Sequence, residues 1–303
     1  MTPLPPDKLL ELEEAAYQIR RLSIEMITYA RWGHPGGSLS LADILAVLYF
    51  QAMTVDPQAP KSESRDRLIL SKAHCSPALY AALALKGFFP EEALYTYCEP
   101  DGLEGHTDMT RTAGIESSGG PLGMGLSVAV GCACGLRLKE NPRPRVFCLL
   151  GDGELNEGNV WEAAMAAAHY HLDNLIAVVD YNKVMAKGFV WELMGIEPLV
   201  DKWIAFGWDV IEVDGHDLQA LADAFHQAHW IRPRGRPIVV IAHTVKGRGV
   251  ELAEFNYKWH THAPEPEVAD AMLRALARRY GRKELGYSKL GAEREKESFY
   301  GGE

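Results

Sequence analysis

The chain lacks the cysteine spacing, the long apolar runs and the basic clusters that mark several common classes of protein. Its five cysteines include no C-x-x-C pair and no metal-binding spacing, so we expect reduced, mostly buried thiols and a cytoplasmic location. No apolar run approaches membrane-spanning length, and the N-terminus has no apolar signal region. The 31 Lys and Arg form no cluster and are outnumbered by 41 Asp and Glu, so we expect neither nucleic acid nor a membrane as a partner.

Internal repeats, low-complexity tracts and inter-domain linkers are also absent from the sequence. Hydrophobic residues make up 47% of the chain, which is enough to form a large core. We therefore expect one domain over residues 1–285, followed by a charged C-terminal tail over residues 286–303.

Strand and helix patterns alternate along the chain, and this alternation predicts an α/β fold. The apolar runs at 146–150, 175–179 and 238–242 are continuous, as expected of parallel strands with both faces covered. Further strands are expected in "DRLILSKAH" and "WDVIEVDGHD". Helices are expected over 8–31, 76–86, 158–170, 217–229 and 265–281, and after the glycine turns in "HPGGSLS", with Ser40 as N-cap, and "GGPLGMG". The predicted fold class is a doubly wound, mostly parallel sheet with helices on both faces.

The stretch "GDGELNEG" follows the strand at 146–150 and predicts a ligand site at the carboxyl end of the sheet. Glycines allow close backbone approach, and a following helix N-terminus favours an anion such as a phosphate. Asp152 would repel that anion unless it binds a cation that the phosphates share, and Mg²⁺ has the required preference for oxygen. Asn182, with 28 residues between it and Gly153, supplies a second oxygen from the next strand end. Glu154 is expected to be an acid favoured by the start of the helix.

A GDG turn followed by a distant Asn is typical of thiamine-diphosphate enzymes, and further segments match one family of them. "HPGGSLS", "SKAHCSPALYAAL", "EGHTDMTRTAGIESSGGPLGMG", "GDGELNEGNVWEA", "DYNK" and "HTVKGRG…WH" occur in the order found in transketolase. The chain resembles the N-terminal, diphosphate-binding half of that family along nearly its whole length. The resemblance implies a thiamine-diphosphate-binding fold, thiamine diphosphate as cofactor, and Mg²⁺, with Ca²⁺ or Mn²⁺ as substitutes.

The resemblance also assigns roles to four histidines. His34 would line the substrate channel, and His106 would contact the first hydroxyls of a ketose donor. His74 would reach the cofactor diphosphate. His260 would lie near both the diphosphate and the sugar, and His34 and His260 would move protons during the reaction. An unshifted imidazole titrates near 6.5, which suits proton transfer in both directions.

The remaining site residues implied by the resemblance bind the cofactor and the metal or lie at an interface. Asp152 and Asn182 would bind Mg²⁺ by their side chains, with the Val184 carbonyl as a third ligand, and Asn182 would also contact the cofactor. Glu157 would lie at an interface between subunits. Close to the cofactor itself we expect Gly153 against the diphosphate and the backbone of Gly120, Pro121 and Leu122 under the aminopyrimidine ring.

The implied reaction is transfer of a two-carbon ketol unit from a ketose or ketose phosphate to an aldose or aldose phosphate. The family's active site also needs a second domain, which supplies a catalytic glutamate, so a C-terminal partner subunit in an α2β2 assembly is expected. The helices near 122–139 and 158–170 would be buried at the interface. Small residues would allow close approach there: Gly123, Gly125, Ala129, Gly131, Ala163 and Ala167.

Some residues depart from the family pattern, and two other interpretations stay open. Thr107 replaces a usual Pro, Thr261 a usual Gly, and Lys187 an Asp of many relatives, which leaves the natural sugar undefined. One alternative is the α subunit of a 2-oxo-acid dehydrogenase or decarboxylase, which shares the GDG turn but not "HPGG", "SKAH" and "GHTD" together. The other is a non-catalytic binding subunit that keeps only the fold, although no predicted metal or histidine residue is lost. His216 and His243 are expected to be ordinary turn and strand-end residues.

Overall fold

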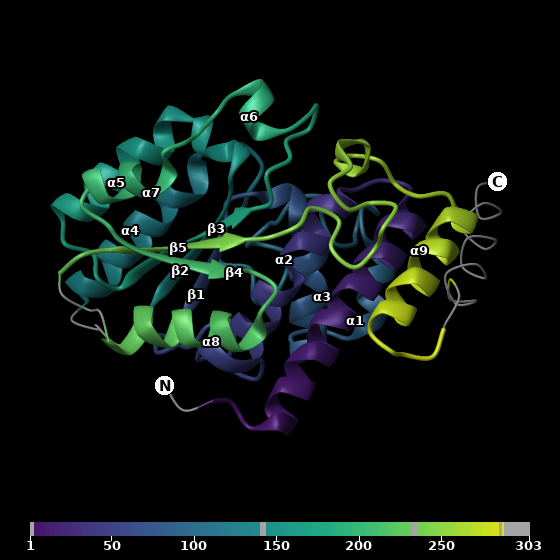
Figure 1. The fold of residues 1–303 in the computed structure, drawn as a ribbon. Helices are drawn as coiled ribbons and strands as arrows, with labels where there is room; N and C mark the ends of the chain where they lie inside the picture. Colours follow the sequence, from purple (N-terminus) through teal and green to yellow (C-terminus); the bar gives the residue numbers. More distant parts are fainter. Residues whose placement is uncertain (1–2, 140–143, 232–234, 285–286, 288–303) are drawn as a thin grey trace.

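A five-stranded sheet forms the centre of the computed structural model, which describes residues 3–139, 144–231, 235–284 and 287. All strand pairs are parallel, and the spatial order is β1-β2-β3-β5-β4 (Figure 1). The strands are β1 (Arg67–Leu70), β2 (Val146–Gly151), β3 (Leu175–Tyr181), β4 (Asp209–Asp214) and β5 (Ile238–His243). The predicted parallel α/β fold is confirmed, while the expected charged tail lies outside the described residues except for Tyr287.

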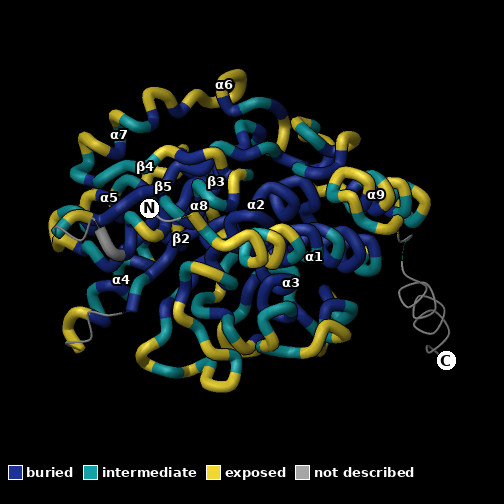
Figure 2. Tube along the Cα trace, turned by 60° about the horizontal axis from the view of Figure 1, so that its bottom comes forward, coloured by how far each residue is buried: buried dark blue, intermediate teal, exposed yellow. Residues whose placement is uncertain are grey.

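Helices cover both faces of this sheet and enclose two separate apolar cores (Figures 1 and 2). One core is shared with α1 (Pro6–Ala30), α2 (Pro35–Val47), α3 (Ser76–Lys86) and α8 (Leu218–His226). The other is shared with α4 (Met124–Leu138), α5 (Gly158–His169) and α7 (Leu199–Ala205). The described residues also form α6 (Val190–Leu193), whose Val190 joins the second core, and α9 (Pro266–Arg279), which packs against α1. Among the helices of the described part of the chain, none has the length and apolar character needed to cross a membrane.

The alternation of side chains along β2 explains why its sequence is continuously apolar. Phe147 and Leu149 enter the core under α3 and α8, whereas Cys148 and Leu150 enter the core under α4 and α5. Successive residues of a strand point to opposite faces, so a strand covered on both faces needs apolar residues at every position. The edge strand β4 has only Val213 buried, which accounts for its more polar sequence.

Helix α2 begins earlier than the sequence predicts, and every one of its residues is buried. Its first residue is Pro35, whose fixed φ suits the first position of a helix. Ser40 is therefore not an N-cap, and this expectation is wrong. Gly36 and Gly37 lie in the first turn of α2, where neighbouring atoms leave no room for a side chain. An added Cβ on Gly37 would stand 2.6 Å from Cys75 Sγ.

Two further expectations about small or apolar residues are wrong. Of the five cysteines, only Cys75 and Cys148 are buried, and Cys98 is exposed. Of the small residues expected at an interface, only Gly131 is exposed, because α4 and α5 pack on each other and on the sheet. The following are already buried within the chain: Gly123, Gly125, Ala129, Ala163 and Ala167.

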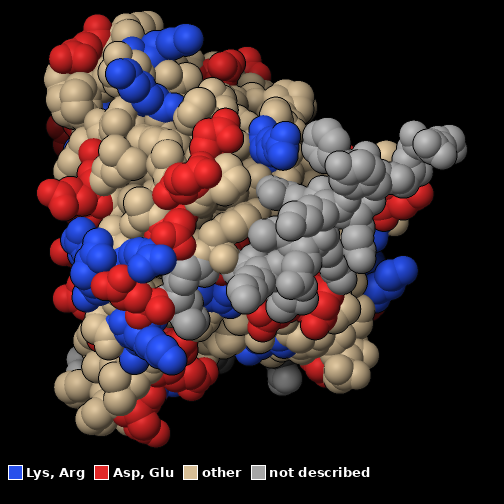
Figure 3. All heavy atoms as spheres, turned by 90° about the vertical axis from the view of Figure 1, so that its right-hand side faces the viewer, with Lys and Arg blue, Asp and Glu red and all other residues tan. Residues whose placement is uncertain are grey.

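Figure 3 shows the side of the molecule that carries α9, and where its side chains are described, acidic and basic groups are interspersed. This distribution agrees with the absence of basic clusters from the sequence.

Two glycines of α4 should respond oppositely to alanine. A Cβ on Gly125 would stand 2.4 Å from Ser71 Cβ and 2.5 Å from its Cα, whereas Gly131 has nothing within 4 Å. Gly125→Ala should lower the free energy of unfolding by about 1–3 kcal/mol through overpacking. Gly131→Ala should raise it by about 0.5–1 kcal/mol, because Ala loses less backbone entropy in a helix. Urea denaturation of the chain measures both, and equal stabilities for the two variants would contradict the packing described here.

Candidate active site

Four histidine rings from separate segments meet beside the carboxyl end of β1. His34 precedes α2, and His74 lies in a short 3-10 helix (Ala73–Cys75) that follows β1. The ring centroids of these two are 5.0 Å apart, and the His260 ring lies 5.2 Å from His74 and 5.5 Å from His34. His106 lies at the margin, 6.4 Å from His34. The structure thus brings together all four histidines singled out in the sequence.

A buried carboxylate, Asp180, lies near this group in β3 and was not predicted. Its Oδ2 accepts hydrogen bonds from the Lys72 ammonium at 2.5 Å and from the Ser40 hydroxyl at 2.7 Å. The same oxygen accepts from Asn182 Nδ2 at 2.8 Å, and Thr244 donates to Oδ1. Burial disfavours its charged form, yet the Lys72 charge and these hydrogen bonds hold the pKa of Asp180 below its ordinary value.

The three predicted metal ligands are adjacent at the ends of β2 and β3. Asp152 is buried, and its Oδ2 accepts from the Lys183 N–H at 2.5 Å, which places the carboxylate against the 182–184 segment. The bond from Asn182 Nδ2 to Asp180 leaves Asn182 Oδ1 facing the Val184 N–H, 3.2 Å away. Burial, and then the charge of Asp180, raises the pKa of Asp152 to about 6.

The donor set that these residues form is a carboxylate, an amide oxygen and a backbone carbonyl. Hard divalent cations such as Mg²⁺ prefer such oxygen ligands. In the described part of the chain, no group of three or more His, Cys, Asp or Glu side chains is arranged to bind a metal. The predicted metal site contains only one side chain of these four residue types, Asp152. Its remaining ligands would be the Asn182 amide oxygen, the Val184 carbonyl and oxygens of a bound ligand or water.

Lys246 is a buried cation that sequence reasoning missed. Its ammonium donates to the Val184 carbonyl at 2.7 Å and to His260 Nδ1 at 2.9 Å, so it joins the segment 182–184 to the histidine group. Burial, and then the charge of Lys72, lowers the pKa of Lys246 to about 8. The signal that could have found both lysines is their position in "SKAH" and "HTVKGRG", each directly after a strand.

Glu154 lies in the first turn of the short 3-10 helix Gly153–Asn156, as expected of an acid at a helix start, but its side chain is buried and has further partners. Its carboxylate accepts from the Gly123 N–H at 2.7 Å, from the Gly151 N–H at 2.9 Å and from the Ser71 hydroxyl. These bonds fasten the GDG turn to the start of α4. Burial raises the pKa of Glu154 above its ordinary value, although the hydrogen bonds oppose the shift.

The other predicted residues surround this centre. The loop with Gly120, Pro121 and Leu122 precedes α4, and Pro121 and Leu122 are exposed. Gly153 lies under Met185, because an added Cβ would stand 2.9 Å from that side chain's Cγ. Glu157 is exposed between Gly153–Asn156 and α5.

The histidines do not have the ordinary pKa that the sequence reasoning assumed. Burial, followed by His106 and Lys246, lowers the pKa of His34 to about 4. Burial, and then the charge of Lys246, lowers the pKa of His260 to about 3. Burial also lowers the pKa of His74 well below 6.5. The imidazoles are therefore neutral at physiological pH; they can accept protons, but they are weaker bases than an ordinary histidine.

Comparison with known proteins shows the family. The family described as "Transketolase, thiamine diphosphate binding domain" matches residues 12–284, and the chain belongs to this family. It corresponds to the N-terminal half of a split transketolase, a transferase, since relatives of its own length are named as transketolase subunits.

Two such relatives and one solved structure illustrate the similarity. The chain is 44% identical over 271 residues to a subunit of the 6-deoxy-6-sulfo-D-fructose transketolase of Clostridium sp. (strain MSTE9), covering 89% of this chain and 98% of that protein. It is 39% identical to one subunit of the apulose-4-phosphate transketolase of Phocaeicola vulgatus, covering 88% and 94%. Transketolase from Campylobacter jejuni superposes with a TM-score of 0.84 at 31% identity, covering 94% of this chain but 45% of that one. The chain therefore spans less than half the length of that solved transketolase.

The low pKa of His34 can be tested by NMR. Its imidazole signal, assigned by its loss in His34→Gln, should not titrate between pH 8 and 5.5, because protonation begins only near the folded-state pKa of about 4. The unfolded chain takes up this proton near pH 6.5, so the stability contribution is present above that pH and declines toward pH 4, at about 1.4 kcal/mol per pH unit. A titration midpoint near 6.5 would contradict the burial and neighbouring charges described above.

Proposed function

We propose that the chain is the diphosphate-binding subunit of a transketolase that depends on thiamine diphosphate and Mg²⁺ and requires a C-terminal partner subunit. The observation that supports this most is the convergence of four neutral histidines with the oxygens of Asp152, Asn182 and Val184. His74, Asp152, Asn182 and Val184 follow the carboxyl ends of β1, β2 and β3, where parallel sheets bind ligands, and His34 at the start of α2 lies against them.

The residues present fit the chemistry of the cofactor. His34 Nδ1 is buried and has no hydrogen-bond partner among the described residues, so a polar group of a ligand would satisfy it. The buried lysines Lys72 and Lys246 provide positive charge for the diphosphate, which His74 would contact. Asp152, Asn182 and the Val184 carbonyl would bind Mg²⁺, or Ca²⁺ or Mn²⁺ in its place, together with the diphosphate oxygens.

The histidines have distinct tasks in the proposed reaction. When bound, thiamine diphosphate supplies an electron sink for cleavage and formation of a carbon–carbon bond beside a carbonyl. Because only a neutral imidazole can accept a proton, His34 and His260 would take protons from sugar hydroxyls and return them to the oxyanion that forms at the aldehyde oxygen of the acceptor. His106, at the margin of the group, would hydrogen-bond to the donor sugar.

The substrates we propose are a ketose donor and an aldose acceptor, either free or with an anionic end group. The names of the two relatives refer to a sulfonated and a phosphorylated sugar, and this supports sugars that bear a charged group. Thr107, Thr261 and Lys187, which depart from the family pattern, are where we expect the substrate preference to differ.

A partner subunit is supported by an apolar surface on α4 and α5. Met124 and Val128 of α4, Met165 of α5 and Leu122 just before α4 are exposed, with 50% of Met124 and 54% of Met165 accessible. Exposed apolar patches of this kind mark interaction sites. We propose that this surface, with Glu157 beside it, is covered in an α2β2 assembly, and that the partner contributes the catalytic glutamate.

Asp152→Asn tests the metal and cofactor assignment. The substitution removes the one full negative charge in the proposed ligand set. At an effective dielectric constant of about 20, a charge pair 4 Å apart is worth roughly 4 kcal/mol. Affinity for thiamine diphosphate in the presence of Mg²⁺ should therefore fall by at least ~100-fold in calorimetry. Asp209→Asn, at the opposite end of the sheet, is the matched control and should bind normally. Unchanged affinity in Asp152→Asn, or wild-type binding that ignores Mg²⁺, would refute the assignment.

The requirement for a partner can be tested by complementation. The purified chain alone should catalyse no two-carbon transfer, and adding the C-terminal subunit encoded in the adjacent reading frame should restore it and increase the mass in light scattering. Met165→Asp should weaken this association by about tenfold or more, since a charge would be buried in the interface. Leu10→Asp, on an exposed position of α1, should not. Turnover by the isolated chain would disprove the requirement.

A further inference from the structure

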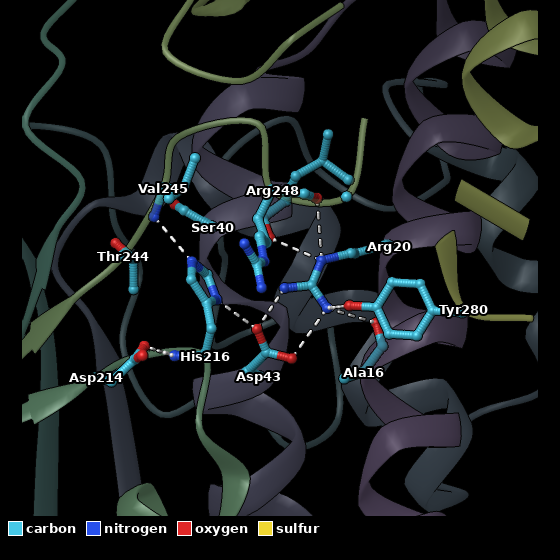
Figure 4. A network of polar contacts seen from close by, with 12 residues as sticks. Ala16, Arg20, Ser40, Asp43, Asp214, His216, Thr244, Val245, Arg248 and Tyr280 are labelled. Atoms are coloured by element: carbon cyan, nitrogen blue, oxygen red, sulfur yellow. Dashed lines mark hydrogen bonds and ion pairs between the residues drawn. The ribbon is translucent and has the colours of Figure 1, made fainter. Parts of the chain in front are cut away.

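A second buried polar network lies behind the site, between α1, α2 and the loop 244–249 (Figure 4). Arg20 of α1 and Asp43 of α2 form a two-pronged ion pair, with Nη1–Oδ1 and Nη2–Oδ2 distances of 3.0 and 2.5 Å. Both side chains are buried, and Arg20 Nη1 also donates to the Tyr280 hydroxyl at 2.6 Å. Arg20 and Asp43 together with His216 are called the Asp43 network below. None of its three members was predicted to have a function.

His216 links this ion pair to the loop 244–249. Its Nε2 accepts the backbone N–H of Val245 at 2.8 Å, and its Nδ1 lies 2.6 Å from Asp43 Oδ2. A backbone N–H can only donate, so Nε2 carries no proton and Nδ1–H donates to the carboxylate. Asp43 thus fixes one tautomer of His216, and that tautomer presents an acceptor to the loop.

The network reaches the same loop at a second point. Arg20 Nε donates to the Arg248 carbonyl at 3.2 Å and to the Leu39 carbonyl of α2 at 3.1 Å. Between these points, the Gly247 N–H donates to the Gly36 carbonyl at 2.9 Å. The loop is therefore fastened to α2 on both sides of Lys246.

Lys246 projects from this loop to the opposite side, into the candidate active site. Its ammonium contacts the Val184 carbonyl and His260 Nδ1, while His34 stands at the start of α2. The position of the Lys246 ammonium therefore depends on the backbone of loop 244–249, which the Asp43 network holds.

We propose that His216 is a positioning residue, which acts with Arg20 and Asp43 to hold the backbone of loop 244–249 so that Lys246 can bind the cofactor diphosphate. This inference rests on the proposed function only in naming the diphosphate as the group that Lys246 binds. The contacts that fasten the loop do not depend on the proposed function. We therefore expect that removal of the His216 imidazole loosens the loop and lowers cofactor affinity, although this imidazole lies outside the histidine group of the site.

A cavity makes this imidazole replaceable. His216 and Asp43 line a cavity of about 510 Å³ that is open to solvent, together with Leu218, Arg248 and Tyr280. In His216→Ala, added imidazole can enter from this side, donate to Asp43 and accept from Val245. 1-Methylimidazole has an acceptor nitrogen but no N–H, so it cannot make both bonds.

The experiment measures two quantities in His216→Ala, with imidazole, with 1-methylimidazole and without either. The first is hydrogen exchange of the 244–249 backbone in the full chain without cofactor. The second is thiamine-diphosphate affinity of the chain assembled with its partner subunit. We expect faster exchange at Val245 and about tenfold or greater loss of affinity, both restored by imidazole but not by 1-methylimidazole. His243→Ala is the matched control, because His243 ends β5 directly before the loop and pairs with exposed Glu212 of β4, and it should leave both quantities unchanged.

A second variant keeps the inference testable if His216→Ala does not fold. The shorter amide of His216→Asn can still donate to Asp43 but does not reach Val245, so it should loosen the loop and weaken cofactor binding while it preserves the ion pair. Unchanged exchange at 244–249 in a folded His216 variant would overturn the inference, and so would faster exchange with unchanged affinity. A wild-type assembly that binds no thiamine diphosphate would instead overturn the proposed function, and the exchange data would still decide whether His216 holds the loop.

Discussion

The carboxylate of Asp180 is the interaction on which the arrangement of the site depends. It is fully buried at the end of β3, and its partners come from the end of β1 (Lys72), from α2 (Ser40) and from the end of β5 (Thr244). A charge removed from water costs several kcal/mol and is tolerated only when it is paired and hydrogen-bonded. The elements that supply these bonds must therefore meet at one point, and this point lies at the carboxyl edge of the sheet.

The same carboxylate connects structure to the proposed chemistry. By accepting a hydrogen bond from Asn182 Nδ2, Asp180 turns the amide oxygen of Asn182 toward the backbone of segment 182–184. By accepting a hydrogen bond from Ser40, Asp180 holds α2 close to the sheet edge. Gly37 in the first turn of α2 then packs against the 3-10 helix that contains His74. The buried charge of Asp180 thus helps to position both the histidine group and the segment 182–184.

The sheet and the histidine group could be predicted from the sequence, because apolar runs and motif residues are local signals. The continuous run before Gly151 predicts a strand covered on both faces, and β2 is such a strand. Lys72 and Lys246 stand in the quoted motifs but were missed, because their partners depend on which strands are neighbours. Strand β5 lies beside β3 only in the folded sheet, and no local pattern reveals that order. His216 lies in the turn expected of it, but its bond to Asp43 could not be predicted, since the two residues are 173 positions apart in the sequence. The bond from Ser40 to Asp180 was missed for the same reason.

The strand order also has a consequence for how the chain folds as it leaves the ribosome. Strand β4 is synthesised before β5, yet its neighbour in the sheet is β5, which inserts between β3 and β4. Until residue 243 has emerged, β3 has one open edge and β4 has no partner, and open strand edges favour pairing with other chains. Strand β5, the last strand within the described part of the chain, completes the interior of the sheet, and Thr244 and Lys246 follow it. The nascent chain therefore acquires its central layer and the polar edge proposed to bind the cofactor in the same late step.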